Sequence, residues 1–235
     1  LHPDAIYVHQ GEQWLIQGFD ADQRIASAVR SAPDYFTQPQ SVGGVRIIGT
    51  DRTKGLGLAT LSYGTVELSS QVTGYLRRDA KTGDVWDSTP LDLPVRTMVT
   101  KATWWTLPDD VLGALDVDPA ELPGAVHAAE HTAIGLLPAI VPCERWDIGG
   151  LSTVLHPDTG RLTVFVHDGL PGGAGFAELG YLNADLWWRA VLDRLLSCPC
   201  DNGCPACVQS PKCGSGNNPL DKRGASELVR VLSLA

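Results

Sequence analysis

The sequence predicts an α+β protein, with an antiparallel β domain over residues 1–107 and an α/β domain over residues 108–235 that ends in a four-cysteine module. Three observations support this prediction. β-Branched and aromatic residues alternate with polar ones up to residue 107, and apolar residues recur at helical spacing beyond residue 108. Finally, five of the six cysteines fall within residues 198–213. A chain of 235 residues with 43% apolar content can bury a sizeable core, in one large domain or two small ones.

The first part of the chain reads as short strands joined by tight turns. Residues 6–16 form two apolar runs around Gln10-Gly11, which is a hairpin signal. A loop containing proline and glutamine is expected over residues 33–40, and a turn at Gly64. The strands are predicted over residues 24–30, 45–48, 56–63, 65–75 and 95–107.

The pattern changes at Pro108, after which helices and strands alternate. Helices are predicted over residues 110–115, 124–140, 176–197 and 219–234, and strands over 153–155 and 162–167. The tryptophan pairs at 104–105 and 187–188 are expected in the core, although aromatic side chains can also stack on bases.

The cysteine cluster predicts a structural Zn²⁺ site, because four thiolates held by short turns suit a tetrahedral ion. Cys204-Pro-Ala-Cys207 is a two-residue knuckle, and Cys213-Gly214 can form a second ligand turn. The predicted ligands are therefore Cys200, Cys204, Cys207 and Cys213, and the zinc-binding module spans about residues 198–222. Cys198 is a fifth candidate, either a substitute ligand or a half-buried thiol.

The same cysteines could instead form disulfides or a redox-active Cys-x-x-Cys motif. Disulfides need an oxidising compartment, and no secretory apolar segment is seen in the sequence. A redox Cys-x-x-Cys should begin a helix after a strand, without three more cysteines around it. Structural zinc is the favoured interpretation.

A second metal-binding pattern lies in the predicted helix over residues 124–140. His127-Ala-Ala-Glu-His131 fits H-x-x-E-H, in which two histidines one turn apart bind zinc and the glutamate activates water. A zinc-dependent hydrolase is therefore the alternative function. It needs a further acidic ligand downstream, for which Glu178 and Glu227 are the candidates. The simpler interpretation is that both histidines lie on the polar edge of an amphipathic helix.

The charge balance neither requires nor excludes nucleic acid as a partner. A net charge of −9 and a pI near 5.0 argue against a surface that is basic overall, but a local patch is compatible with them. The candidate contacts with nucleic acid are cations near the cysteines and at a predicted hairpin tip: Lys212, Lys222, Arg223, Arg77 and Arg78.

Other motifs limit the range of activities. No G-x-x-x-x-G-K-[ST] sequence occurs, so the chain has no P-loop motif for ATP. The glycines of residues 169–175 lie between a strand and a helix, where they can form a tight turn or contact a phosphate. No apolar run approaches eighteen residues, so no membrane span is expected.

Three stretches together resemble a known family. They are Asp147-Ile-Gly-Gly-Leu-Ser-Thr153, Phe165-Val-His-Asp-Gly-Leu-Pro-Gly-Gly-Ala-Gly175, and the cysteine block continuing through Asn218-Pro-Leu-Asp-Lys222. They are similar to the zinc-binding C-terminal domain of MrfA-type (SftH-type) superfamily II DNA helicases. Residues 7–13 and 34–37 resemble the β region that precedes this domain in those proteins.

The resemblance implies an accessory domain of an ATP-dependent, 3′-to-5′ DNA helicase that acts in DNA repair in the cytoplasm, as in the bacterial cytosol or nucleoid. The motor domains, with their ATP and Mg²⁺, would lie outside this chain, so no catalytic residue is expected within it. DNA, expected to be single-stranded, and the motor domains of the same polypeptide are the implied partners. The family motif maps the zinc ligands onto Cys200, Cys204, Cys207 and Cys213, but relatives often carry cysteine at 198 as well, which leaves the choice of four open.

Overall fold

Two long strands form a β-hairpin whose turn lies at Gly57-Leu58. In the computed structural model, which describes residues 1–20 and 22–233, β4 (Tyr35–Leu56) and β5 (Ala59–Asp79) pair along this hairpin. Gly57 has φ +54°, a value that favours glycine. The turn predicted at Gly64 is wrong. A Cβ there would lie 2.1 Å from the carbonyl oxygen of Gly49, so this glycine instead allows β4 and β5 to approach closely.

β4 also includes residues 35–40 of the segment that was expected to be a loop, residues 33–40. It contains Pro39, which has no N–H to donate to a neighbouring strand. Such a residue is accepted at the edge of a sheet, and β4 is the terminal strand in the sheet order. Position in the sheet therefore overrides the local loop signal.

The chain divides into two compact units that interrupt one another in sequence. Unit 1 comprises Leu1–Val42 and Ser70–Arg96, and unit 2 comprises Gly43–Ser69 and the chain from Thr97 onward. β4 and β5 contribute residues to both units. The boundary expected between residues 107 and 108 lies within unit 2, and it stays a prediction about which parts fold independently.

Unit 1 is made of antiparallel strands. β1 (Ile6–His9), β2 (Glu12–Asp20) and β3 (Ile25–Arg30) form a three-stranded sheet, and β6 (Val85–Pro90) pairs with β5. The hairpin predicted around Gln10-Gly11 is confirmed: these residues have φ of 51° and 80°, as a tight two-residue turn requires.

The sheet of unit 2 carries the helices. Its strand order is β4-β5-β7-β9-β8, with β7 (Arg96–Leu107), β8 (Ile148–Thr153) and β9 (Leu162–Asp168). β9 pairs antiparallel with both β7 and β8. The predicted combination of antiparallel sheet and helices is confirmed, although β8 begins five residues before the strand expected at 153–155.

Five α-helices are described in unit 2: α1 (Asp109–Gly113), α2 (Leu122–Leu136), α3 (Phe176–Leu182), α4 (Ala184–Ser197) and α5 (Lys222–Leu232). The 3-10 turn η1 (Leu137–Ala139) extends α2. The single helix predicted over residues 176–197 is broken at Asn183, whose side-chain amide donates to the carbonyl of Leu179. None of the helices within the described residues has the length and apolar character needed to cross a bilayer.

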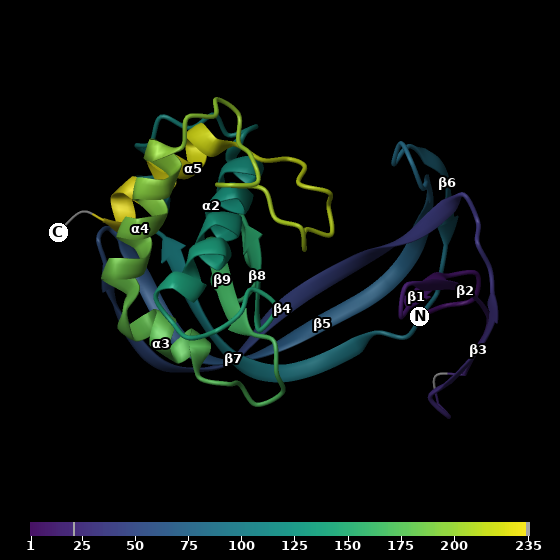
Figure 1. The fold of residues 1–235 in the computed structure, drawn as a ribbon. Helices are drawn as coiled ribbons and strands as arrows, with labels where there is room; N and C mark the ends of the chain where they lie inside the picture. The colour runs from purple at the N-terminus through teal and green to yellow at the C-terminus, as the bar shows by residue number, and fades with distance from the viewer. Residues whose placement is uncertain (21, 234–235) are drawn as a thin grey trace. The chain divides into compact units, whose positions relative to one another are not determined.

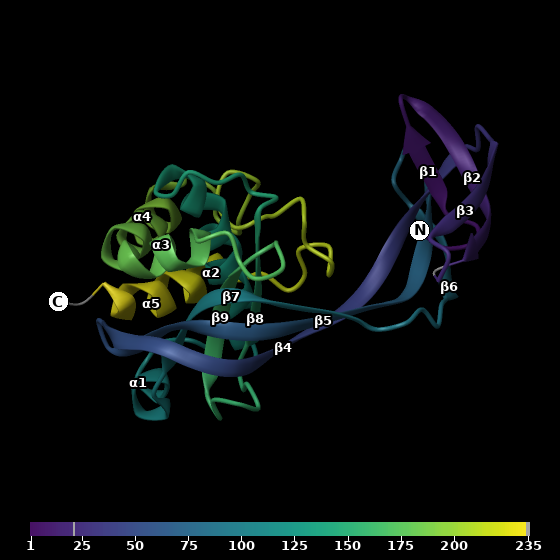
Figure 2. The same cartoon turned by 90° about the horizontal axis from the view of Figure 1, so that it is seen from below.

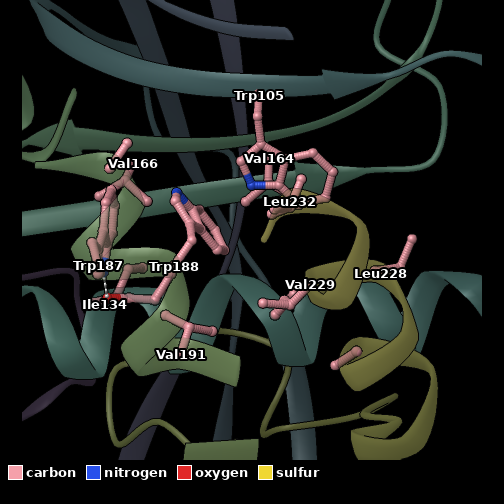
Figure 3. Close-up of a cluster of buried hydrophobic side chains, with 14 of the residues drawn as sticks. Trp105, Ile134, Val164, Val166, Trp187, Trp188, Val191, Leu228, Val229 and Leu232 are labelled. Carbon is pink, nitrogen blue, oxygen red and sulfur yellow. Dashed lines mark hydrogen bonds between the residues drawn. The ribbon is translucent and has the colours of Figure 1, made fainter. Parts of the chain in front are cut away.

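The core of unit 2 lies where α2, α4 and α5 meet and face the sheet (Figures 1 and 2). Trp105 from β7 meets Trp188 from α4 edge-on, with ring centroids 5.7 Å apart, as Figure 3 shows. The indole nitrogen of Trp187 donates to the carbonyl of Ala133 on α2, at 2.9 Å. These three tryptophans are buried, as is Trp104, so the expectation that they belong to the core is confirmed.

Candidate metal centre

The end of α4 brings the first cysteine into position. Cys198 follows the last helical residue, Ser197, and its extended backbone turns the chain out of the helix. Gly203, with φ +101°, then reverses the chain direction so that Cys204 and Cys207 return toward the earlier pair. The backbone N–H of Cys207 donates to the carbonyl of Cys204, which closes the two-residue knuckle.

Four sulfur atoms converge at this point. The Sγ–Sγ distances are 3.6 Å from Cys198 to Cys200 and to Cys204, 3.4 Å from Cys200 to Cys207, and 3.7 Å from Cys204 to Cys207. A tetrahedron with Zn–S bonds of about 2.3 Å has S–S edges of about 3.8 Å, whereas a disulfide has an S–S bond of about 2.0 Å. The four-cysteine cluster therefore fits one Zn²⁺ and excludes disulfides among these cysteines.

Two of the four sulfurs have a hydrogen-bond donor beside them. The backbone N–H of Cys204 donates to the sulfur of Cys207, at 3.3 Å. The ammonium of Lys222, at the start of α5, lies 3.5 Å from the sulfur of Cys200 and donates to the carbonyls of Cys198 and Cys200 at 2.8 and 2.5 Å. Four thiolates around Zn²⁺ carry a net charge of about −2, which the nearby cation partly offsets.

The structure brings together three of the four predicted ligands and adds Cys198 in place of Cys213. The loop after Cys207 explains this arrangement: the side chain of Asn217 bonds both the N–H and the carbonyl of Ser210, at 2.7 and 3.1 Å. That loop directs Cys213 away from the other sulfurs and toward His127. In the sequence, Cys198-Pro-Cys200 was the available signal, because a close cysteine pair beside a knuckle can supply both remaining ligands.

A second cluster contains His127 and His131, together with Cys213. The histidines lie one turn apart on α2, on the same face of the helix. The sulfur of Cys213 is 3.4 Å from Nε2 of His127. Burial and the neighbouring His127 lower the pKa of His131 to about 4, so its imidazole is neutral near pH 7.

Both histidines line a cavity of about 600 Å³ between α2, β8 and the cysteine-rich loop. Glu130 lies in its wall and accepts a hydrogen bond from the hydroxyl of Ser152, at 2.6 Å. Burial raises the pKa of Glu130 to about 7. Neither acidic candidate for the H-x-x-E-H site joins this group: Glu178 pairs with Arg52 at 2.6 Å, and Glu227 lies 3.6 Å from Arg230.

A family model described as the MrfA Zn-binding domain matches residues 129–208. This range contains all four cysteines of the cluster and does not contain Cys213. In addition, "Uncharacterized protein MJ1572.1" from Methanocaldococcus jannaschii is 37% identical over 112 residues, which make up 98% of that protein and 46% of this chain. The chain belongs to the MrfA zinc-binding domain family.

Longer relatives of this MrfA-family domain are named as helicases. "Uncharacterized ATP-dependent helicase YprA" from Bacillus subtilis is 28% identical over 210 residues, covering 88% of this chain and 27% of that protein. "ATP-dependent helicase HRQ1" from Saccharomyces cerevisiae is 23% identical over 256 residues, covering 99% of this chain and 23% of that protein. The chain thus spans about a quarter of the length of these two helicases.

The structural comparison covers the whole domain. The crystal structure of the DUF1998 helicase MrfA bound to DNA matches with a TM-score of 0.70 and 26% sequence identity, covering 99% of this chain and 30% of that chain. The similarity therefore extends beyond the cysteine-rich region to the β-rich part of this MrfA-family domain.

The cations predicted to contact nucleic acid differ in how firmly they are held. The ammonium of Lys212 donates to the carbonyls of Arg145 and Ile148, at 3.0 and 2.7 Å, and burial lowers its pKa. Lys222 is bonded beside the cysteines, as described above. Arg223 forms an exposed ion pair with Asp116, at 2.6 Å.

The two remaining cations lie in unit 1. Arg77 pairs with Asp87 across β5 and β6, and Arg78 donates to the side chain of Gln38 at 2.6 Å and to the carbonyl of Gly83 at 2.8 Å. Both arginines are therefore held by side-chain and backbone contacts within unit 1.

The glycine loop over residues 169–175 is organised around an internal anion. The carboxylate of Asp168, which is fully buried, accepts the N–H groups of Ala174, Gly175 and Ala177 at 2.5, 2.9 and 2.8 Å. These are the groups that a bound phosphate would need at the start of α3. The sequence left open whether this loop forms a tight turn or contacts a phosphate. Its hydrogen bonds to Asp168 favour the tight turn.

Proposed function

We propose that this chain is a zinc-stabilised accessory domain of an ATP-dependent superfamily II DNA helicase. The observation that carries the proposal is the four-cysteine cluster, placed within a domain whose full length is similar to part of a helicase crystallised with DNA. The motor domains of the same polypeptide would bind ATP and Mg²⁺. The 3′-to-5′ polarity, the role in DNA repair and the cytoplasmic location follow the family resemblance.

The role assigned to zinc is structural. Four protein thiolates fill a tetrahedral ion and leave no position for substrate. Cys198 and Cys207 are buried in the same core cluster as Leu228, which lies on α5. The metal would therefore join the end of α4 to α5. Structural zinc contributes roughly 10–16 kcal/mol in small peptides, which is comparable with the whole stability of a domain.

Contact with single-stranded DNA is assigned first to Arg223. Its side chain is 77% exposed, and an exposed ion pair such as that with Asp116 is worth at most about 1 kcal/mol. A phosphate can therefore replace Asp116 at little cost. Lys212 and Lys222, by contrast, would have to give up internal hydrogen bonds before they could bind DNA.

The test uses the complete helicase that carries this domain. Unwinding is measured on duplexes with only a 3′ or only a 5′ single-stranded overhang, and DNA affinity by fluorescence anisotropy at several salt concentrations. We expect unwinding from the 3′ overhang, and an Arg223→Glu variant that binds DNA several-fold more weakly. Arg189→Glu, an exposed arginine on α4, is the matched control and should bind as the wild type does.

Each part of the proposal can fail separately. Unwinding that does not require ATP, or no unwinding of either duplex, would contradict the helicase assignment. Equal DNA affinity for Arg223→Glu and the wild type would remove Arg223 from the DNA contact while leaving the helicase assignment in place. A Cys204→Ser variant that binds as many zinc ions per chain as the wild type and keeps its thermal stability would contradict the structural role of the metal.

A further inference from the structure

The cluster of His127, His131 and Cys213 is not used by the function proposed above. Its potential ligand atoms all lie within 4.8 Å of one another, and they come from two separate elements, helix α2 and the loop after the four-cysteine cluster. Helical spacing places the two imidazoles on one face, and the Ser210–Asn217 hydrogen bonds hold the third residue opposite them. The fold itself therefore gathers these three side chains.

A backbone carbonyl holds Nδ1 of each histidine, and Nε2 of His127 lies 3.4 Å from the sulfur of Cys213. Nδ1 of His127 lies 2.8 Å from the carbonyl oxygen of Pro219, and Nδ1 of His131 lies 2.8 Å from that of Val208. A carbonyl oxygen only accepts, so Nδ1 is the donor in each ring, and in the neutral imidazole Nε2 is the nitrogen with a lone pair. Histidines that bind metal are commonly held in this way, with one ring nitrogen donating to a carbonyl and the other directed toward the metal site.

The sulfur of Cys213 accepts a backbone hydrogen bond, as the sulfur of Cys207 does in the four-cysteine cluster. It accepts the backbone N–H of Asn217, at 3.2 Å, and it lies 3.1 Å from the hydroxyl of Ser215. The corresponding bond in the four-cysteine cluster runs from the N–H of Cys204 to the sulfur of Cys207, at 3.3 Å. The contacts with Asn217 and Ser215 fix the position of the Cys213 sulfur beside the histidines.

We propose that His127, His131 and Cys213 form a second Zn²⁺ site in this protein. Two imidazole nitrogens and one thiolate suit Zn²⁺ better than Mg²⁺ or Ca²⁺, which prefer oxygen ligands. Three protein ligands leave one tetrahedral position vacant, and all three residues line the cavity of about 600 Å³. The site thus differs from the four-cysteine centre in having a position for water or another small ligand.

The experiment counts metal on the purified protein. The protein is equilibrated with excess Zn²⁺, passed through a desalting column, and analysed for zinc and protein by mass spectrometry. We expect two zinc ions per chain in the wild type, and one in both His127→Ala and Cys213→Ser. His167→Gln is the matched control, because His167 is also a half-buried histidine that lines the same cavity, and it should retain two.

Circular dichroism on the same samples separates loss of the site from loss of the fold. His127 is only half-buried, so His127→Ala is expected to fold even if Cys213→Ser does not. One zinc per chain in the saturated wild type would overturn the proposal, as would two in a folded His127→Ala variant. Neither result bears on helicase activity or on the four-cysteine centre, so the two proposals fail independently.

Discussion

Cys198 lies in the four-cysteine cluster, where the sequence-based prediction placed Cys213. Replacing Cys198 therefore tests which cysteines bind the metal. Its sulfur is 3.6 Å from those of both Cys200 and Cys204, so Cys198→Ser removes one of four converging ligands. If structural zinc contributes roughly 10–16 kcal/mol, one ligand is worth about 2.5–4 kcal/mol. With about 1.4 kcal/mol for each factor of ten, zinc affinity should fall roughly 10²- to 10³-fold.

The assay is competition for zinc against a chromophoric chelator. To avoid a contribution from the cluster on α2, the comparison is made between Cys213→Ser alone and Cys213→Ser combined with Cys198→Ser. We expect the single variant to keep one tightly bound zinc ion and the double variant to lose affinity by the stated factor. A single variant without tightly bound zinc, or a double variant with unchanged affinity, would refute the reasoning and favour the ligand set predicted from sequence.

Three further predictions follow from the same contacts. Lys222→Met should destabilise the zinc-loaded protein by about 3 kcal/mol in urea unfolding, because the part-buried carbonyls of Cys198 and Cys200 lose a charged donor. Arg223→Met, which removes only an exposed ion pair, should change stability by at most about 1 kcal/mol, and equal effects would contradict the role given to Lys222. Asp168→Asn should cost about 2–3 kcal/mol in the same assay, because an amide cannot accept all three N–H groups of the glycine loop as well as a carboxylate does; an unchanged midpoint would argue against this loop being held by its own anion. Removal of zinc with a chelator should make residues 198–222 sensitive to limited proteolysis, and equal digestion with and without metal would show that zinc does not order this segment.

Local patterns were sufficient where a segment's structure depends mainly on its own residues. The Gln10-Gly11 hairpin and β9 were predicted within a residue or two, because turn chemistry and apolar runs are read directly from the chain. The turn at Gly64 was not predictable in this way. That glycine is needed because the backbone of Gly49 passes close to it, and sequence spacing alone does not reveal which strand will be its neighbour.

Asn183 gives a second example of the same limit. The apolar pattern on both sides of it is helical, and one helix over residues 176–197 is its simplest interpretation. The break lies where the polar side chain of Asn183 bonds back to the carbonyl of Leu179, and it divides the segment into α3 and α4. The direction of α4 after this break decides where Cys198 lies.

By itself, the sequence determined that the protein combines antiparallel strands with helices and that its crowded cysteines have the spacing of a zinc-binding cluster, because residue type and spacing carry that information. The tertiary structure decided which cysteines meet. Cys198 joins the cluster because α4 ends there, and Cys213 faces His127 because Asn217 closes the intervening loop. Ligand geometry depends on the directions in which separate elements leave the core, and those directions are set by packing among α2, α4 and α5.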